Sequence, residues 1–476
     1  MFTATMSCTS GIRGKKAMVG GWRVRRVSGG LLRLVVTRPG VSVTCALVVI
    51  LAAAVAAAGL TLTASDGLTL ARKAALFDVD IVERFMLPPG QVATRRRLPV
   101  PGRPYVTHNM PDNAYMTGIY CAAQTWRHLS TGAPAASRLA GDACAALAHL
   151  TDVSGRSGLL ARASVTTGAR WFDDGVWRES PDGRHRWRGD VSSDQVDGLM
   201  FGIFVYVTHL ADTDRRARLA DAVGAIVDAV LGNDLRIIGY NGEPTRWGHY
   251  EPAYVMNDEP MNALLILQMV KVAHAVTGDA RYDREYRRLI ELGYARIGER
   301  ARPDEPPLDV NHSDDVLIAL ALFPLLELER DPSIRAHYLE AARRWFRGGA
   351  HPGIDAEANP FASFLWSHWS GDTRDTAAGI DTLRNVPLDM KWNADTIAAY
   401  ETRFGFTFDT EPVRRMDAGI RPLPIGQRGR TWSFLVHNPY VVGGDRETQA
   451  PFETNGLDFL VSYWFGRAHG MIRPGE

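Results

Sequence analysis

Hydrophobic residues recur at helical spacing along most of the chain. In segment 192–210 the apolar side chains follow the i, i+3, i+4, i+7 rule, and the remaining faces are also largely apolar. The next segment, 213–231, has one apolar face opposite a charged face. The first pattern is typical of a helix buried on most sides, and the second is typical of an outer helix. Because no β-alternation of any length is present, the chain is expected to form an all-α domain.

This alternation of buried and amphipathic helices repeats along the sequence. Further buried helices are expected at 112–128, 257–277, 313–329 and 455–468, and further outer helices at 135–150, 279–300 and 331–347. Two other stretches, near 156–171 and 357–369, make the count compatible with six inner/outer hairpins. Six such hairpins closed in a ring form an (α/α)6 toroid. Beyond this alternation the sequence shows no internal repeat.

The first hundred residues follow a different pattern. Residues 1–40 carry many basic side chains and no acidic one, and residues 41–64 are uncharged and mostly apolar. Such a stretch is long enough to cross a bilayer core of about 30 Å. By the positive-inside rule the tail stays in the cytoplasm and the rest of the chain is exported. We therefore expect a single-pass protein of a bacterial cytoplasmic membrane; a cleaved signal peptide is the alternative.

Residues 65–104 are expected to separate the anchor from the helical domain. They contain a short amphipathic stretch and then the Pro/Gly/Arg-rich segment LPPGQVATRRRLPVPGRP, which is typical of a stalk. The toroid domain is accordingly expected at 105–476. It contains two cysteines, Cys121 and Cys144, and either a disulfide or a buried pair of thiols is compatible with their spacing.

Composition narrows the function classes. The chain has 476 residues, of which 46% are hydrophobic and 22% charged, with a formal net charge of +1. Outside the N-terminal tail the basic residues form no single stripe, so nucleic acid is not an expected partner. No Cys/His zinc pattern and no EF-hand pattern is present, so neither a metal nor another cofactor is expected.

Acidic residues precede or begin the predicted inner helices. In a ring of hairpins these helices run parallel, so their N-termini open on one face. Helix capping explains any one acidic cluster, but carboxylates that converge raise one another's pKa, as a general acid beside a general base requires. The candidate catalytic residues are Asp194, Glu259, His312, Asp314 and Asp315.

A second group of candidates would hold a sugar. The segment GYNGEPTRWGHYEPAYVMND, residues 239–258, is expected to be a long loop on the same face. Trp247 and Tyr250 can stack on sugar rings, or they can pack the domain as large aromatics usually do. The other predicted substrate contacts are Trp177, Gln195, Arg246, His249, Glu251 and Asn257.

Three segments are motif-like: SSDQVDGLMFG, GEPTRWGHYEP and NHSDDVLIALALFPLLELERDP. They resemble segments of bacterial exported proteins, and from Tyr105 onward the pattern resembles the six-hairpin, (α/α)6-toroid glycosidase superfamily. This resemblance implies inverting glycoside hydrolases, with polysaccharide lyases and sugar epimerases on similar toroids.

The expected function is therefore that of a membrane-anchored glycoside hydrolase-like enzyme acting on a cell-envelope or exported polysaccharide. Asp194 and Asp314 are expected to serve as general acid and general base, with His312 tuning Asp314. Two alternatives stay open. One is a lyase or epimerase that uses His249, Tyr250 and Arg246, and the other is a non-catalytic glycan-binding envelope protein.

Overall fold

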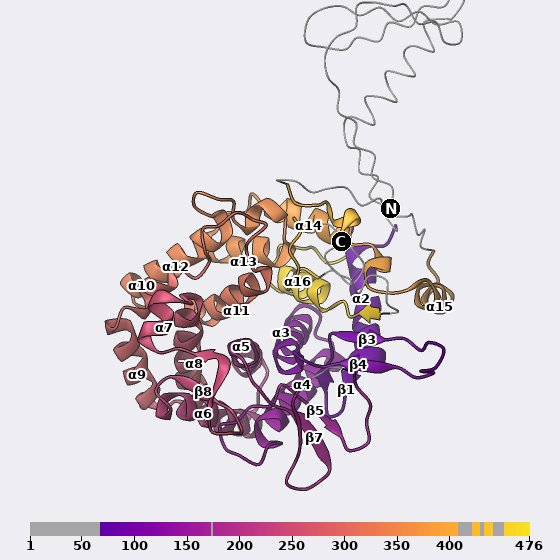
Figure 1. Cartoon of the computed structure of the whole chain (residues 1–476). Helices are drawn as coiled ribbons and strands as arrows, with labels where there is room; N and C mark the ends of the chain where they lie inside the picture. The colour runs from indigo at the N-terminus through magenta and orange to yellow at the C-terminus, as the bar shows by residue number, and fades with distance from the viewer. Residues whose placement is uncertain (1–66, 173–174, 408–420, 429–432, 441–451) are drawn as a thin grey trace, which may run out of the picture. The chain divides into compact units, whose positions relative to one another are not determined.

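Six helices among the described residues form a closed inner ring (Figure 1). The computed structural model describes residues 67–172, 175–407, 421–428, 433–440 and 452–476. Each inner helix packs against the next, and the last packs against the first. In chain order the inner helices are α3 (Asn113–Thr131), α5 (Ser193–His209), α8 (Met261–Thr277), α11 (His312–Leu328), α13 (Pro360–Ser370) and α16 (Leu457–Ala468).

An outer layer of helices surrounds this ring. It consists of α4 (Pro134–Asp152), α6 (Thr213–Gly232), α9 (Ala280–Glu291) with the short α10 (Tyr294–Gly298), α12 (Pro332–Arg347), α14 (Thr376–Arg384) and α2 (Leu70–Asp80). The outer helix behind α16 is α2, so the sixth hairpin joins the two ends of the described chain. The predicted (α/α)6 toroid is confirmed for the described part of the chain.

The prediction that residues 65–104 separate an anchor from the domain is wrong from residue 67 onward, because the amphipathic stretch forms α2 of the outer layer. The buried Lys73 on α2 donates hydrogen bonds from Nζ to the carbonyls of Arg384 (2.6 Å) and Val386 (2.8 Å). Strand β3 (Arg95–Arg97) lies between β4 (Thr107–Asn109) and β10 (Phe452–Thr454) in an antiparallel sheet. The domain therefore begins before Tyr105, and its first helix is part of the toroid.

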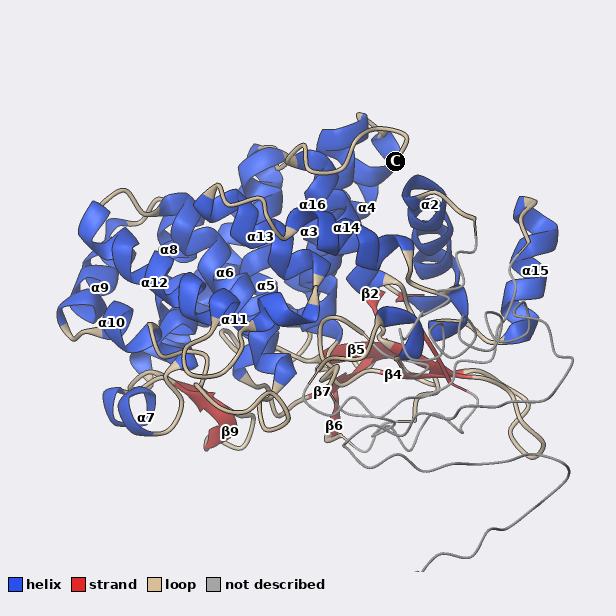
Figure 2. Ribbon diagram, turned by 90° about the horizontal axis from the view of Figure 1, so that it is seen from above, coloured by secondary structure: helices blue, strands red, loops and turns tan. Residues whose placement is uncertain are grey.

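Short strands accompany the helices, although none was expected. They are β1 (Met86–Leu87), β2 (Gln91–Val92), β5 (Ala163–Thr166), β6 (Trp177–Glu179), β7 (His185–Arg188), β8 (Arg236–Ile238) and β9 (Pro244–His249), in addition to β3, β4 and β10. The helix expected near 156–171 is replaced by turns and β5. Figure 2 shows the labelled strands on one side of the helical ring. Because β4, β7, β9 and β10 precede inner helices, this side is where the inner helices begin.

The centre of the ring is packed with aromatic side chains. Trp126 on α3 meets Phe201 on α5, Phe323 on α11 and Phe465 on α16, with ring centroids 5.9, 5.7 and 4.9 Å apart. Aromatic pairs at these distances contribute beyond the area that they bury. Since this part of the ring is filled, a site between the inner helices has to lie toward their N-terminal ends.

Helices α3 and α5 pack backbone against backbone. A Cβ atom on Gly118 would lie 1.8 Å from the carbonyl oxygen of Gly198, and one on Gly202 would lie 2.4 Å from that of Gly118. Only glycine fits at such a contact. On the other side of α3, Cys121 and Cys144 are buried free thiols with their Sγ atoms 2.8 Å apart.

The basic tail and the predicted anchor at 41–64 lie outside the described residues. Within the part of the chain that the structure describes, no helix combines the length and apolarity needed to span a membrane.

Candidate active site

Four carboxylates from separate inner-helix starts form a chain of electrostatic neighbours, in which Asp194 acts on Asp112 and Asp314, and Asp314 acts on Glu259. They are Asp112, just before α3; Asp194, in the first turn of α5; Glu259, just before α8; and Asp314, in the first turn of α11. We call this set the mouth cluster. Burial is the largest cause that raises the pKa of Asp112 and Asp314 to about 6 and that of Glu259 to about 7. The negative charge of Asp194 further raises the pKa values of Asp112 and Asp314, and the negative charge of Asp314 further raises the pKa of Glu259.

Asp194 is held by donors from its own helix start. Its carboxylate accepts hydrogen bonds from the Gln195 backbone N–H (2.9 Å), the Gln195 side-chain amide (3.1 Å) and the Ser192 hydroxyl. The same Gln195 amide lies 3.4 Å from Asp112, and its carbonyl accepts from the backbone N–H of Tyr115 (3.3 Å). Gln195, predicted to contact substrate, is therefore buried and positions Asp194 relative to Asp112.

Asp314 and Glu259 are half-buried on the neighbouring helix starts. Asp314 accepts a hydrogen bond from the Asn311 side-chain amide (3.0 Å), and Asn311 is also the N-cap of α11. The nearby Asn257 does not join them, because it is exposed and donates to the carbonyl of Ala253 within α7 (Pro252–Asn257). Among the described residues, the acidic candidates Asp194, Glu259 and Asp314 are thus brought together.

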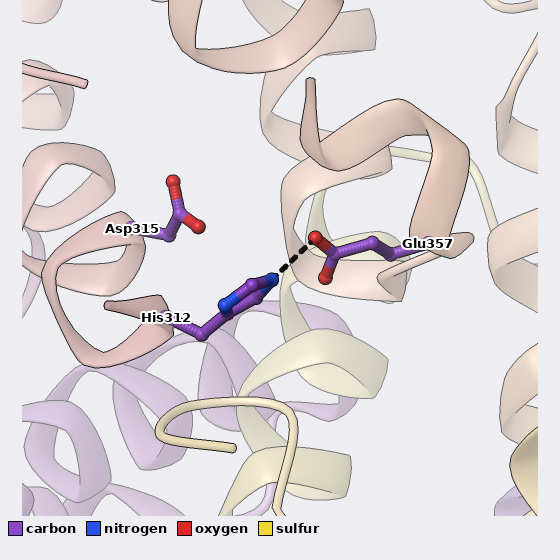
Figure 3. Close-up of side chains that lie close together, drawn as sticks. All are labelled: His312, Asp315 and Glu357. Atoms are coloured by element: carbon purple, nitrogen blue, oxygen red, sulfur yellow. Dashed lines mark hydrogen bonds and ion pairs between the residues drawn. The ribbon is translucent and has the colours of Figure 1, made fainter. Parts of the chain in front are cut away.

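The candidates His312 and Asp315 lie in a different group of side chains; Figure 3 shows them with Glu357, which contacts His312. Asp315 is buried and accepts a hydrogen bond from Nε of Arg302 (2.7 Å). Nε2 of His312 lies 2.7 Å from Oε1 of Glu357, and its Nδ1 lies 3.0 Å from the Val310 carbonyl. Both ring nitrogens are engaged with groups other than Asp314, so they form no hydrogen bond with it, and the tuning of Asp314 by His312 stays a prediction.

The His312, Asp315 and Glu357 ligand atoms lie within 4.8 Å of one another, which raises the question of a metal. Two arginines already accompany the carboxylates: Arg302 pairs with Asp315, and Arg428 donates to the Glu357 carbonyl (3.1 Å). Burial opposes a charged His312, but the hydrogen bond and the charge of Glu357 outweigh it and raise the His312 pKa. A divalent cation would be repelled by these guanidinium groups, so we interpret the group as a buried ion-pair cluster.

The segment predicted as the loop 239–258 is a β8–β9 hairpin followed by α7. On β9, Trp247 is 51% exposed, and the Arg246 guanidinium lies 4.5 Å from its ring. His249 contacts Glu251 (3.1 Å), which also accepts from Nε of Arg236 (3.0 Å).

Whereas Trp247 is exposed, Tyr250 lies in the interior. It is fully buried, and its backbone carbonyl accepts a hydrogen bond from the Tyr294 hydroxyl (2.7 Å). The trio of His249, Tyr250 and Arg246 proposed for a lyase is therefore divided between the interior and the surface. Trp177, also predicted to bind sugar, packs on Trp171 with ring centroids 4.4 Å apart.

Two acidic residues of this region were not predicted. Asp112 has the same sequence signal as the others, since it directly precedes an inner helix. Asp197 lies one turn after Asp194, and burial raises its pKa well above the ordinary range. An interaction with the Gln268 side chain opposes this rise, and the charge of Asp197 would act on the Tyr115 and Tyr250 phenols. Its i+3 spacing from Asp194 could have identified it.

A pocket of about 300 Å³ lies beside the mouth cluster. Asp112 lines it together with Arg95 from β3, His437, and Asp458 from the first turn of α16. Arg162 lies 3.6 Å from the Asp112 carboxylate. The pocket therefore places cationic and acidic side chains next to Asp112, whereas Asp194, Glu259 and Asp314 are not among its lining residues.

The comparisons with known proteins concern the fold. No family model matches the chain, and no curated protein matches it in sequence. A sugar epimerase from a ruminal bacterium is similar in structure, with 10% identity, a TM-score of 0.38, and coverage of 68% of this chain and 88% of the epimerase. The endoglucanase CelQ from Clostridium thermocellum, complexed with cellobiose and cellotriose, is 11% identical with a TM-score of 0.40, over 80% of this chain and 63% of CelQ.

The six-hairpin arrangement that the sequence pattern predicts is present in the described part of the chain. The TM-scores are low, so the toroid assignment rests on the closed ring of six inner helices and the outer layer behind it.

Proposed function

We propose that the chain is a glycoside hydrolase-like enzyme whose reaction takes place at the mouth cluster. The observation that supports this most directly is the convergence of Asp112, Asp194, Glu259 and Asp314 from four helix starts. Hydrolysis of a glycosidic bond needs one carboxyl group that holds a proton near neutral pH and one that is ionised. The raised pKa values of Asp314 and Glu259 suit the first role, and the donors around Asp194 suit the second.

In the proposed reaction Asp194 accepts a proton from a water molecule as the water oxygen attacks the anomeric carbon. The bond from that carbon to the leaving oxygen breaks, and Asp314 delivers its proton to this oxygen. Glu259 is the second proton-holding group, and its position beside Asp314 makes it the alternative acid. Asp112, bridged to Asp194 by Gln195, keeps the base in place.

The proposed location is outside the cytoplasmic membrane, with residues 41–64 as the anchor. A cell-envelope or exported polysaccharide is then the accessible substrate. Protease treatment of intact cells, followed by detection of the two ends of the full chain, tests the topology. Digestion of the C-terminal domain with protection of the tail is expected, and protection of both ends would contradict the proposed topology.

Substitution of the mouth cluster tests the chemistry. Asp194→Asn and Asp314→Asn are each expected to lower kcat by roughly 10²–10⁴-fold in a reducing-sugar assay, since each removes a proton-transfer group. Asp283→Asn on α9, where the carboxylate pairs with Arg287 at the surface, is the matched control and should leave kcat unchanged. Full activity in Asp194→Asn would contradict the proposal. An unsaturated product would identify a lyase, and glycan binding without turnover would identify a binding protein.

A further inference from the structure

Arginine side chains stack on exposed aromatic rings along the strand-bearing face. The Arg246 guanidinium lies 4.5 Å from the centroid of Trp247. At the tip of the same hairpin, Tyr240 has two arginines over its ring, Arg156 at 3.7 Å and Arg178 at 4.6 Å. Trp247 is 51% exposed and Tyr240 is 40% exposed. Both rings remain accessible to water in the folded protein, whereas large aromatic side chains are usually buried.

Two more stacks continue the pattern on neighbouring segments. Arg170 lies 4.2 Å from the ring of Tyr105, which is 38% exposed. Arg186 on β7 lies 5.2 Å from the ring of Trp171, which packs on Trp177 of β6. We call the four stacks, centred on Tyr105, Trp171, Tyr240 and Trp247, the arginine–aromatic belt.

Contacts on the strand-bearing face link some of the segments that carry the belt. Trp171 bridges to His108 on β4, which is close in sequence to Tyr105. Trp187 on β7 touches Tyr240 at the tip of the β8–β9 hairpin, with ring centroids 5.6 Å apart. Figure 2 shows β4, β6, β7 and β9 on the same side of the ring. Since β4 directly precedes α3 and β7 directly precedes α5, the belt lies on the face where inner helices of the mouth cluster begin.

The stacks offer two kinds of contact. An exposed aromatic ring can pack on the apolar face of a sugar ring, and Trp247, which is 51% exposed with Arg246 over its ring, is the stack most open to this contact. A guanidinium group above an aromatic ring carries its N–H donors in its own plane, where they match the two oxygens of a carboxylate. Two carboxylates, Glu179 and Asp182, lie on or next to the same sheet, and Asp182 is already paired with Arg184 (3.7 Å). The combination favours a chain that carries sugar rings and carboxylate groups together.

We propose that the arginine–aromatic belt binds an acidic polysaccharide, with uronate carboxylates on its guanidinium groups and sugar rings on its exposed aromatic rings. This inference rests on the proposed function, because it names the substrate class of the same site. It assigns a role to Arg156, Arg170, Arg178 and Arg186, none of which belongs to the mouth cluster.

The test measures binding by the full chain carrying Asp194→Asn, so that turnover does not disturb the measurement. The probes are polygalacturonate, dextran as a neutral polymer, and polyphosphate as an anion without sugar rings. Polygalacturonate is expected to bind, to bind more weakly as salt rises, and to bind more tightly than either other probe. Trp247→Ala and Arg246→Gln are each expected to weaken binding about tenfold.

Two further variants sharpen the test. Arg246→Lys keeps the charge but loses the planar fork, so its affinity should fall between those of the parent and Arg246→Gln. Arg343→Gln on outer helix α12 is the matched control, because Arg343 pairs with Glu340 on the same helix and lies away from the strands. The control should bind as the parent does.

Several outcomes would overturn the inference: equal binding of dextran, equal binding of polyphosphate, or no effect of Arg246→Gln and Trp247→Ala. Turnover of a neutral glycan by the unmodified chain without polygalacturonate binding would also overturn it, while leaving the proposed hydrolase intact. Polygalacturonate binding that depends on the belt, combined with absence of any hydrolysis, would support the inference and refute the proposed catalysis.

Discussion

Asp314 and Glu259 retain protons at a pH where ordinary carboxylic acids are ionised. Their pKa values, about 6 and about 7, are raised first by burial and then by neighbouring carboxylates. Because Asp314 is among the charges that raise the Glu259 pKa, Asp314→Asn is expected to lower it. Carboxyl carbon NMR titration of the folded protein measures this directly. An unchanged Glu259 titration would show that the two groups do not share a site.

The raised pKa of Glu259 also makes the stability of the fold depend on pH. A carboxyl group whose pKa is higher in the folded state than in the unfolded state stabilises the fold at low pH, and this contribution is lost as pH rises through the folded value. For Glu259 the loss falls between its ordinary pKa of 4.5 and about 7.

The substitution Glu259→Gln is therefore expected to stabilise the domain at pH 8 by about 1–3 kcal/mol relative to the parent, and to have little effect at pH 4. Urea unfolding at the two pH values measures the difference. Asp283→Asn, at the surface of α9, provides the comparison. A stabilisation that is equal at both pH values would indicate a packing effect without linked protonation.

At the scale of elements, the contact between α3 and α5 depends on three glycines. A methyl group at Gly198 would lie 2.6 Å from the Tyr115 carbonyl oxygen and 2.7 Å from its Cα, which the backbone cannot accommodate without moving. The two helices also carry or adjoin Asp112, Gln195 and Asp194, so their separation sets the geometry of the mouth cluster.

Gly198→Ala is expected to destabilise the domain by about 3 kcal/mol, because overpacking forces the helices apart. Thermal unfolding measures the change. The matched control is Gly232→Ala at the end of α6, where an added Cβ meets nothing within 4 Å. If both variants unfold at the temperature of the parent, α3 and α5 are not in backbone contact.

At the scale of the whole molecule, the two ends of the described chain complete one hairpin. Helix α2 is the outer partner of α16, and β3 holds β10 in its sheet. A fragment that begins at residue 101 would lack both α2 and β3 and would expose the apolar side of α16.

We expect fragment 67–476 to unfold cooperatively and fragment 101–476 to aggregate or to unfold without a cooperative transition. The physical reason is the loss of a complete outer helix, including the buried Lys73, from a closed ring. Circular dichroism melts of the two fragments make the comparison. Identical melts would show that α2 is not part of the stable fold.

Much of this architecture is determined locally. The difference between helices apolar on most faces and helices with one apolar face is visible in each segment, because burial selects it residue by residue. The parallel direction of the inner helices then follows from the alternation. This parallel direction predicts that Asp194, Glu259 and Asp314 lie near one another, and the electrostatic contacts of Asp314 with the other two agree with it.

Tertiary packing decided which side chains face the mouth cluster and which face other partners. Asp314 and Asp315 are adjacent in sequence, but successive helical residues are turned by about 100°, so one faces the mouth cluster and the other faces Arg302. The partner of His312 is 45 positions away in the chain. The strands are too short to show alternation, and α2 has a role in the ring only because α16 lies beside it. Local sequence patterns identify five of the six inner helices at their acidic or polar starts, but not the turns and strand at 156–171. Helix rotation and the meeting of distant segments, which no local pattern encodes, decide which side chains form the site.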